Sequence, residues 1–187
     1  MTSQPEGEFL PMLTKEERFN GLHERHFEAI RRYAFRRSPT LADDIVSETF
    51  LVAWRRIDEV PDDERPWLFG VARNVRLNLQ RSSRRQYAVS ERLAEQPASA
   101  ADACAATSNA VAAALTALSE SDREILLLHA WEGLNRREIG AVLNCSAANV
   151  SVRLHRARKR FTAALASDPR NIQSLSRPIS GGAPDVV

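Results

Sequence analysis

Apolar residues recur at intervals of three and four positions along most of this chain, and this spacing limits the folds that it can adopt. Between Lys15 and Arg37 the apolar stripe comprises Phe19, Leu22, Phe27, Ile30, Tyr33 and Ala34. Such spacing places side chains on one face of an α-helix, whereas a strand needs strict alternation, which is nearly absent here. The 187 residues include 7 glycines, and runs of Ala, Leu, Arg and Glu favour helix. The sequence therefore predicts an all-α protein.

The first half of the chain is expected to form a helical module over residues 15–85, after a disordered N-terminus of residues 1–14. Its first helix should end before Pro39, because proline disfavours helix in the preceding residue. Thr40 is the expected N-cap of a second helix that runs to about Ile57. A third helix should carry Pro66 in its first turn, where the missing N–H leaves no hydrogen bond unmade.

Composition shifts towards Ala, Ser and Gln after this module, and we interpret residues 86–109 as a flexible linker. As a flexible coil, the linker would hold its ends roughly 30 Å apart, close to the ~34 Å of one turn of B-DNA. A second module is expected over residues 110–166, followed by a disordered tail, residues 167–187. The sequence thus predicts two small helical domains joined by a flexible linker.

The stretch NRREIGAVLNCSAANVSVRLHRARKR, Asn135 to Arg160, predicts that the second domain is a helix-turn-helix. Capping patterns precede its helices: Ser121 with Glu124, Asn135 with Glu138, and Ser146. The last helix would place its N-terminal half against base edges in the major groove, and its basic end on phosphates. The residues expected on DNA are Ala148, Asn149, Ser151, Val152, Arg153, His155, Arg156, Arg158, Lys159 and Arg160. The alternative is an ordinary helical hairpin with a solvated basic face.

The formal net charge is only +2, but the charges are unevenly spread. Residues 41–64 carry eight acids against Arg55 and Arg56, residues 70–90 carry five arginines and no acid, and residues 153–160 carry five basic residues and no acid. Because phosphate repels carboxylates, this asymmetry predicts two surfaces for nucleic acid and an acidic one for a protein partner. A merely solvated face is the alternative interpretation of the acidic helix.

The expected third helix combines aromatic rings with arginines. Such a combination suits single strands, in which unstacked bases meet rings and guanidinium planes. The residues expected on a single strand are Trp67, Arg73, Asn74, Arg76, Arg81, Arg84 and Arg85, with Phe69 and Tyr87 nearby. Trp67 and Phe69 could equally be core residues, and the sequence leaves these alternatives open.

Other classes of protein find little support in the sequence. No apolar run approaches the roughly 20 residues that span a bilayer, and MTSQPEGEFL lacks the basic start and apolar core of a signal peptide. Cys104 and Cys145 make neither a disulfide framework nor a zinc set. We therefore expect a cytoplasmic protein without membrane insertion, metal, cofactor or enzymatic activity.

Two segments, LADDIVSETFLVAWRRID and RPWLFGVARNVRLNLQRSSRR, precede the helix-turn-helix. Together the three resemble a bacterial RNA polymerase sigma factor of the extracytoplasmic-function type, group IV of the sigma-70 family. The resemblance covers about residues 15–85 and 110–165. It implies a protein that binds core RNA polymerase, directs it to specific promoters and helps to melt the −10 region without nucleotide hydrolysis.

The resemblance also implies a role for each module. The region 2-like module would dock on the β′ clamp helices, with contacts from Asp43, Asp44, Ser47, Glu48 and Trp54. Its third helix, with the loop from Pro61 to Arg65, would capture the −10 element. The region 4-like module would read the −35 element, and the β flap and an anti-sigma factor are further implied partners.

Ser47, Asn78 and Ser151 depart from the family, in which Gln, Asp and Arg are frequent at these positions. A stand-alone helix-turn-helix repressor or activator is the alternative function. It would explain the second module but not the first, and we would expect it to dimerise on a palindrome.

Overall fold

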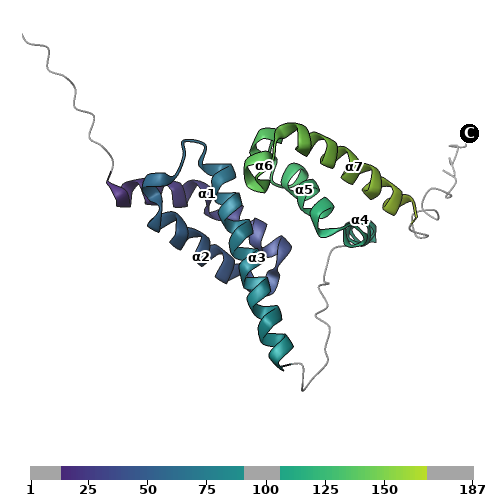
Figure 1. Cartoon of the computed structure of the whole chain (residues 1–187), viewed down its shortest axis with the longest axis horizontal. Coiled ribbons are helices and arrows are strands. Elements are labelled where there is room, and N and C mark those ends of the chain that lie inside the picture. Colours follow the sequence, from purple (N-terminus) through teal and green to yellow (C-terminus); the bar gives the residue numbers. More distant parts are fainter. Residues whose placement is uncertain (1–13, 91–105, 168–187) are drawn as a thin grey trace, which may run out of the picture. The chain divides into compact units, whose positions relative to one another are not determined.

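The computed structural model describes residues 14–90 and 106–167, and within these ranges the regular elements are all helices. The chain forms two compact units, Met1–Ala94 and Glu95–Val187, whose helices are coloured purple to teal and green to yellow in Figure 1. The predicted all-α class is confirmed for the described part. The expected disorder of residues 1–13 and 168–187, and residues 91–105 of the expected linker, lie outside that part.

The first unit contains α1 (Lys15–Arg37), η1 (Pro39–Leu41), α2 (Ala42–Arg55), η2 (Ile57–Glu59) and α3 (Glu64–Ser90). α1 has the predicted bounds, and Thr14 caps it: the Thr14 hydroxyl accepts from the Glu17 N–H, and the Glu17 carboxylate accepts from the Thr14 N–H. The three long helices pack on one another around fully buried side chains that include Leu22, Ile45 and Leu68. This packing gives each helix one exposed face.

Two predicted boundaries in this unit differ from the structure. Thr40 lies inside the 3-10 turn η1, and Leu41 occupies the N-cap of α2 without a side-chain cap, so the predicted N-cap is wrong. Pro39 at the start of η1 supplies the fixed φ that favours such a turn. Pro66 lies in the first turn of α3 as predicted, but α3 continues to Ser90 and takes residues 86–90 from the expected linker.

The second unit contains α4 (Ala106–Ala117), α5 (Glu120–Ala130), α6 (Arg136–Leu143) and α7 (Ala147–Ala166), and the first three all pack against α7. Ser119, not Ser121, caps α5, because the Asp122 N–H donates to the Ser119 hydroxyl at 3.2 Å. The predicted caps Asn135 and Ser146 are confirmed. α7 is therefore the central helix of this unit and presents its opposite face outward.

Candidate nucleic-acid and protein interfaces

The turn between α6 and α7 has the geometry of a helix-turn-helix. Asn144 adopts a left-handed conformation with φ 52°. The Cys145 N–H donates to the Gly140 carbonyl at 2.9 Å, and the Asn144 N–H donates to the Ala141 carbonyl at 3.4 Å. These two bonds close a Schellman motif at the end of α6. A Cβ at position 140 would lie 2.6 Å from the Cys145 carbonyl oxygen, so glycine at this position is what allows the tight turn.

The packing of α7 separates a buried side from an exposed one. Val150 and Leu154 of α7, and Ile139 and Val142 of α6, are buried as predicted, whereas Leu143, also predicted inside, is half-buried. The predicted DNA-contacting residues that are exposed are Ala148, Asn149, Val152, His155, Arg156, Arg158, Lys159 and Arg160. Ser151 is half-buried, and its hydroxyl donates to the Ala147 carbonyl at 2.9 Å.

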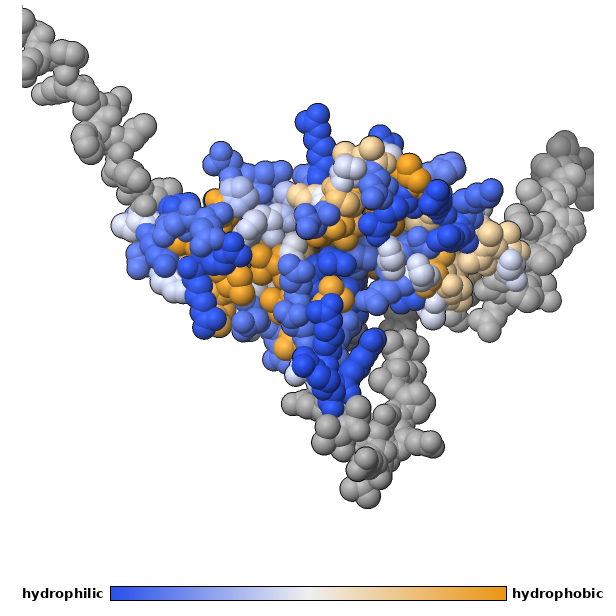
Figure 2. Space-filling view, viewed as in Figure 1, coloured by the Kyte–Doolittle hydropathy of each residue, from blue (hydrophilic) through white to orange (hydrophobic). Residues whose placement is uncertain are grey.

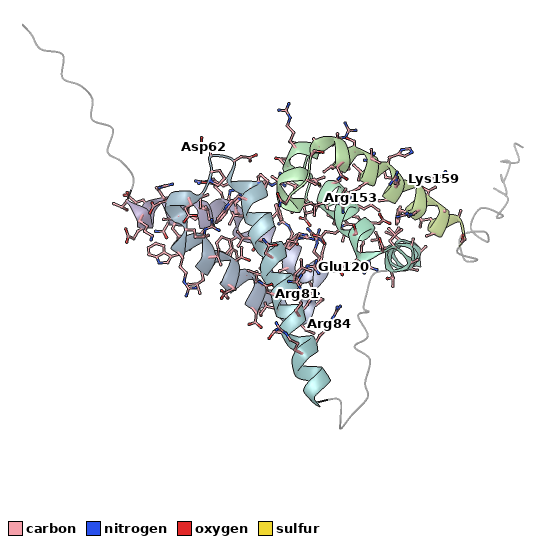
Figure 3. All side chains as sticks on the ribbon, viewed as in Figure 1. Asp62, Arg81, Arg84, Glu120, Arg153 and Lys159 are labelled. Atoms are coloured by element: carbon pink, nitrogen blue, oxygen red, sulfur yellow. The ribbon has the colours of Figure 1, made fainter. Side chains whose placement is uncertain are left out.

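Two of the predicted DNA-contacting arginines are bound to α5. Arg153 Nη2 donates to the Ser121 hydroxyl at 2.7 Å, and Arg160 forms an ion pair with Asp122, which is only 8% exposed. Figure 3 labels Arg153 and Lys159 on this helix. Arg153 and Arg160 therefore fasten α7 to α5, whereas Arg156, Arg158 and Lys159 are exposed.

The arginines of α3 divide in the same way. Arg76 is 4% exposed, and its guanidinium donates to the Gln80 side chain at 3.1 Å, while Gln80 donates to the Ser38 hydroxyl at 3.0 Å. The structure thus buries Arg76, whose partner Gln80 links α3 to Ser38 at the end of α1. By contrast, Asn74 and the later arginines Arg81, Arg84 and Arg85 are exposed, and the surface is hydrophilic along this part of α3 in Figure 2. Arg73 is half-buried.

The rings near the start of α3 have different environments. Phe69 is 1% exposed and packs edge-on against Tyr33 with ring centroids 5.4 Å apart, so it belongs to the core. Trp67 is half-buried, and the Arg56 guanidinium lies 5.9 Å from its ring centroid. The side chain of Tyr87 lies outside the described part. Of the two rings described, Trp67 is therefore the one that retains exposed surface.

The acidic face of α2 is exposed as predicted at Asp43, Asp44, Ser47 and Glu48. Leu51, which sequence reasoning missed, is 38% exposed although it is a large hydrophobic residue. Its position one turn beyond Glu48 is the signal that could have placed it on this face. An apolar side chain within a polar rim is typical of protein interfaces.

Trp54 lies at the edge of this face. It is half-buried, its ring centroid is 5.3 Å from that of Phe19, and the Lys15 ammonium is 5.1 Å from its centroid. Its packing onto α1 leaves the ring partly exposed.

None of the helices in the described ranges is long and apolar enough to cross a membrane.

Comparison with known proteins matches each of the two units to a protein family. Residues 22–86 match the family model "Sigma-70 region 2", and residues 108–161 match "Sigma-70, region 4". The chain belongs to the sigma-70 family. Its relatives in that family include ECF RNA polymerase sigma factors, and the chain is a sigma factor of this extracytoplasmic-function type, not a stand-alone repressor.

Three relatives illustrate the similarity. The chain is 30% identical over 162 residues to RNA polymerase sigma factor NccH of Alcaligenes xylosoxydans xylosoxydans, which covers 80% of this chain and 87% of NccH. It is similar to the solved structure of CnrH in complex with the cytosolic domain of CnrY, with TM-score 0.57 and 30% identity over 80% of this chain and 88% of CnrH. It also shares the fold of the sigma factor RpoE from Bartonella quintana, solved with the anti-sigma factor NepR, with TM-score 0.66 and 24% identity over 83% and 99% of the two chains.

Proposed function

We propose that this sigma factor binds core RNA polymerase through α2, places it on a promoter through α7, and captures the opened −10 strand with α3. The observation that carries the proposal is the separation of exposed charge between helices. Carboxylates occupy the free face of α2, whereas exposed arginines occupy the C-terminal half of α3 and the outer face of α7. A protein partner and a polyanion can therefore bind without competing for one surface.

The acidic face of α2 suits the β′ clamp helices. Asp44, Glu48 and Leu51 follow one another at helical spacing and are all exposed. An exposed ion pair contributes only about 0.2–1 kcal/mol, so several carboxylates and the apolar area of Leu51 would have to act together. Trp131, 48% exposed at the C-cap of α5, is an aromatic anchor that suits the β flap.

The outer face of α7 suits the major groove at the −35 element. Asn149 can pair with adenine and Arg156 with guanine by two hydrogen bonds each, and Val152 offers an apolar contact to a thymine methyl group. Val152 is 50% exposed, which leaves its methyl groups available for such a contact. Arg158 and Lys159 extend beyond these residues towards the phosphates.

The −10 element would meet Trp67, Asn74 and the exposed end of α3, together with the loop from Pro61 to Arg65. Extruding a base costs a few kcal/mol, and stacking on a ring returns about 1–3 kcal/mol per base. Binding energy can therefore open the duplex without nucleotide hydrolysis. We place this activity in the cytoplasm, with an anti-sigma protein of the kind bound to RpoE as a further partner.

Co-purification tests the docking role of α2. Full-length protein carrying Asp43→Lys together with Glu48→Lys should recover less core polymerase than the unchanged protein, because two attractive charges become repulsive. A variant with Glu16→Lys and Glu24→Lys is the matched control, since these acids are exposed on α1. Equal recovery of polymerase by both variants, with unchanged circular dichroism, would remove the docking role from α2.

A further inference from the structure

The connection between α2 and α3 is fastened to α1 at its start. Arg18 Nη2 donates to the Ile57 carbonyl at 3.1 Å, and Arg18 Nη1 donates to the Asp58 carboxylate at 3.2 Å. Both acceptors belong to η2, which ends where the loop begins. One α1 side chain therefore holds both the backbone and a carboxylate of this turn.

A second set of contacts fastens the same connection at its end. Arg25 donates to Glu64 through Nη2 at 2.8 Å and through Nε at 3.2 Å, and His26 Nε2 lies 3.0 Å from the Glu64 carboxylate. Glu64 is the first residue of α3, so these contacts fix the position at which the helix begins. A Cβ at Gly21 would lie 3.0 Å from Arg25 Nη1, so Gly21 leaves room for the guanidinium to lie along α1.

Between these anchors an open hollow of about 300 Å³ lies between the loop and α1, and its lining includes Leu22, Val60 and Pro61. Figure 3 shows Asp62 on this loop, and Pro61, Asp62 and Asp63 are all exposed. The conformation of the loop tip therefore depends on its two fastened ends.

Ion pairs also reduce the free negative charge at both ends of the connection between α2 and α3. Asp58, Glu59 and Glu64 form ion pairs with Arg18, Arg56 and Arg25, respectively. A carboxylate paired with a guanidinium repels a nearby phosphate less than a free one does. These pairs therefore lower the repulsion of a strand at both ends of the connection, while Asp62 and Asp63 stay exposed at its tip.

We infer that Arg18 and Arg25 are positioning residues for promoter opening, which hold the segment from Pro61 to Arg65, the loop and the first two residues of α3, in the conformation that receives the −10 strand. The inference rests on the proposed function of α3 and this loop. In the free protein these arginines order the loop, so that strand capture does not have to supply the entropy of ordering it. Their guanidinium groups need not touch DNA themselves.

The test uses full-length protein with core polymerase, on a promoter mapped by transcription of genomic fragments with the unchanged holoenzyme. Arg25→Ala should lower the rate of opening, read from a fluorescent base analogue in the −10 region, about fivefold, or about 1 kcal/mol. Affinity for a single-stranded −10 oligonucleotide should fall similarly. Affinity for core polymerase, and for a −35 duplex that ends upstream of −10, should stay unchanged.

Two further variants separate positioning from general stability. Arg25→Lys keeps the charge but loses the two-point geometry, so it should restore part of the opening rate. Arg31→Ala is the matched control, because Arg31 pairs at 3.1 Å with Glu28 on its own helix; it should open the promoter like the unchanged protein.

The possible results separate the inference from the proposed function. Equal opening by Arg25→Ala and Arg31→Ala would overturn the inference. A parallel loss of core affinity and opening in Arg25→Ala would also overturn it, because a merely structural role weakens α2 and the loop together. If the unchanged protein opened no promoter with core polymerase, the proposed function itself would fail.

Discussion

Replacing Gly140 with alanine tests whether the tight turn between α6 and α7 sets the position of the DNA-reading helix. The added Cβ would lie 2.6 Å from the Cys145 carbonyl oxygen, whereas ordinary contact begins at 3.4 Å. The contacted atom is backbone, and the same residues are joined by the hydrogen bond from the Cys145 N–H to the Gly140 carbonyl. The substitution therefore has to displace the turn.

The magnitude follows from two opposing effects. Overpacking at a rigid site costs about 1–3 kcal/mol, while alanine in place of glycine within a helix returns up to about 1 kcal/mol. We expect a net loss of about 1–2 kcal/mol, which for a unit of this size lowers the melting temperature by about 4–16 °C. Displacement of α7 should also weaken sequence-specific DNA binding by the holoenzyme.

Amide hydrogen exchange of the full-length protein, read by mass spectrometry, localises the effect to α6 and α7. Gly21→Ala is the control, because its Cβ would meet only the end of the flexible Arg25 side chain, at 3.0 Å. It should leave exchange in the second unit unchanged. If Gly140→Ala and the unchanged protein showed the same exchange over α6 and α7, the close approach would not constrain the turn, and the reasoning would be refuted.

The remaining predictions concern single side chains. Arg156→Ala should cost about 1–3 kcal/mol in discrimination between promoter sequences; an equal loss on every sequence, measured by competition binding, would make Arg156 a phosphate contact. Arg160→Ala should instead lower the thermal stability of the second unit, because it leaves the buried Asp122 unpaired. Arg158→Ala is the control, and equal melting temperatures of the two variants would contradict this prediction. Burial raises the pKa of the Glu64 carboxyl, but hydrogen bonds from Arg25 and His26 and their charges outweigh burial and hold that pKa below its usual 4.5. The contacts of Glu64 with Arg25 and His26 therefore stabilise the first unit above pH 4.5, and this stabilisation is lost as the pH falls through the lowered pKa of Glu64. The difference in free energy of unfolding between Glu64→Gln and the unchanged protein, measured by urea unfolding, should accordingly shrink in acid. A difference that stayed constant with pH would argue against these contacts.

Local chemistry made several elements predictable from the sequence. Asn135 with Glu138, and Ser146, lie beside the N–H groups that they cap, so no distant contact is needed to recognise them. The predicted N-cap Ser121 is wrong, because the hydroxyl of Ser119, two residues earlier, caps α5 instead. Contacts beyond the capping pattern hold this helix junction: Arg123 donates to the Leu115 carbonyl at 2.7 Å and so joins α5 to the end of α4.

Which arginines are buried or bound to another helix, and which are exposed, could not be predicted in the same way. Arg76 is buried on a helix that is joined to Ser38, at the end of α1, through Gln80, and nothing in the local sequence shows which helix lies opposite. Arg160 is likewise fastened to Asp122, which is distant in sequence. Leu51 had a usable local signal, since it lies in the acidic face at helical spacing. Partners from other helices therefore decide which basic residues remain available for DNA.

Promoter binding with and without core polymerase is the most direct measurement of the central claim, that polymerase docking and DNA contact are assigned to different helices of one chain. Footprinting should show weak, unlocalised binding by the purified protein, and protection of both the −35 and −10 regions once core polymerase is added. The Asp43→Lys, Glu48→Lys variant should lose this protection. Tight protection of a single palindromic site by the protein alone, unaffected by core polymerase, would contradict the account.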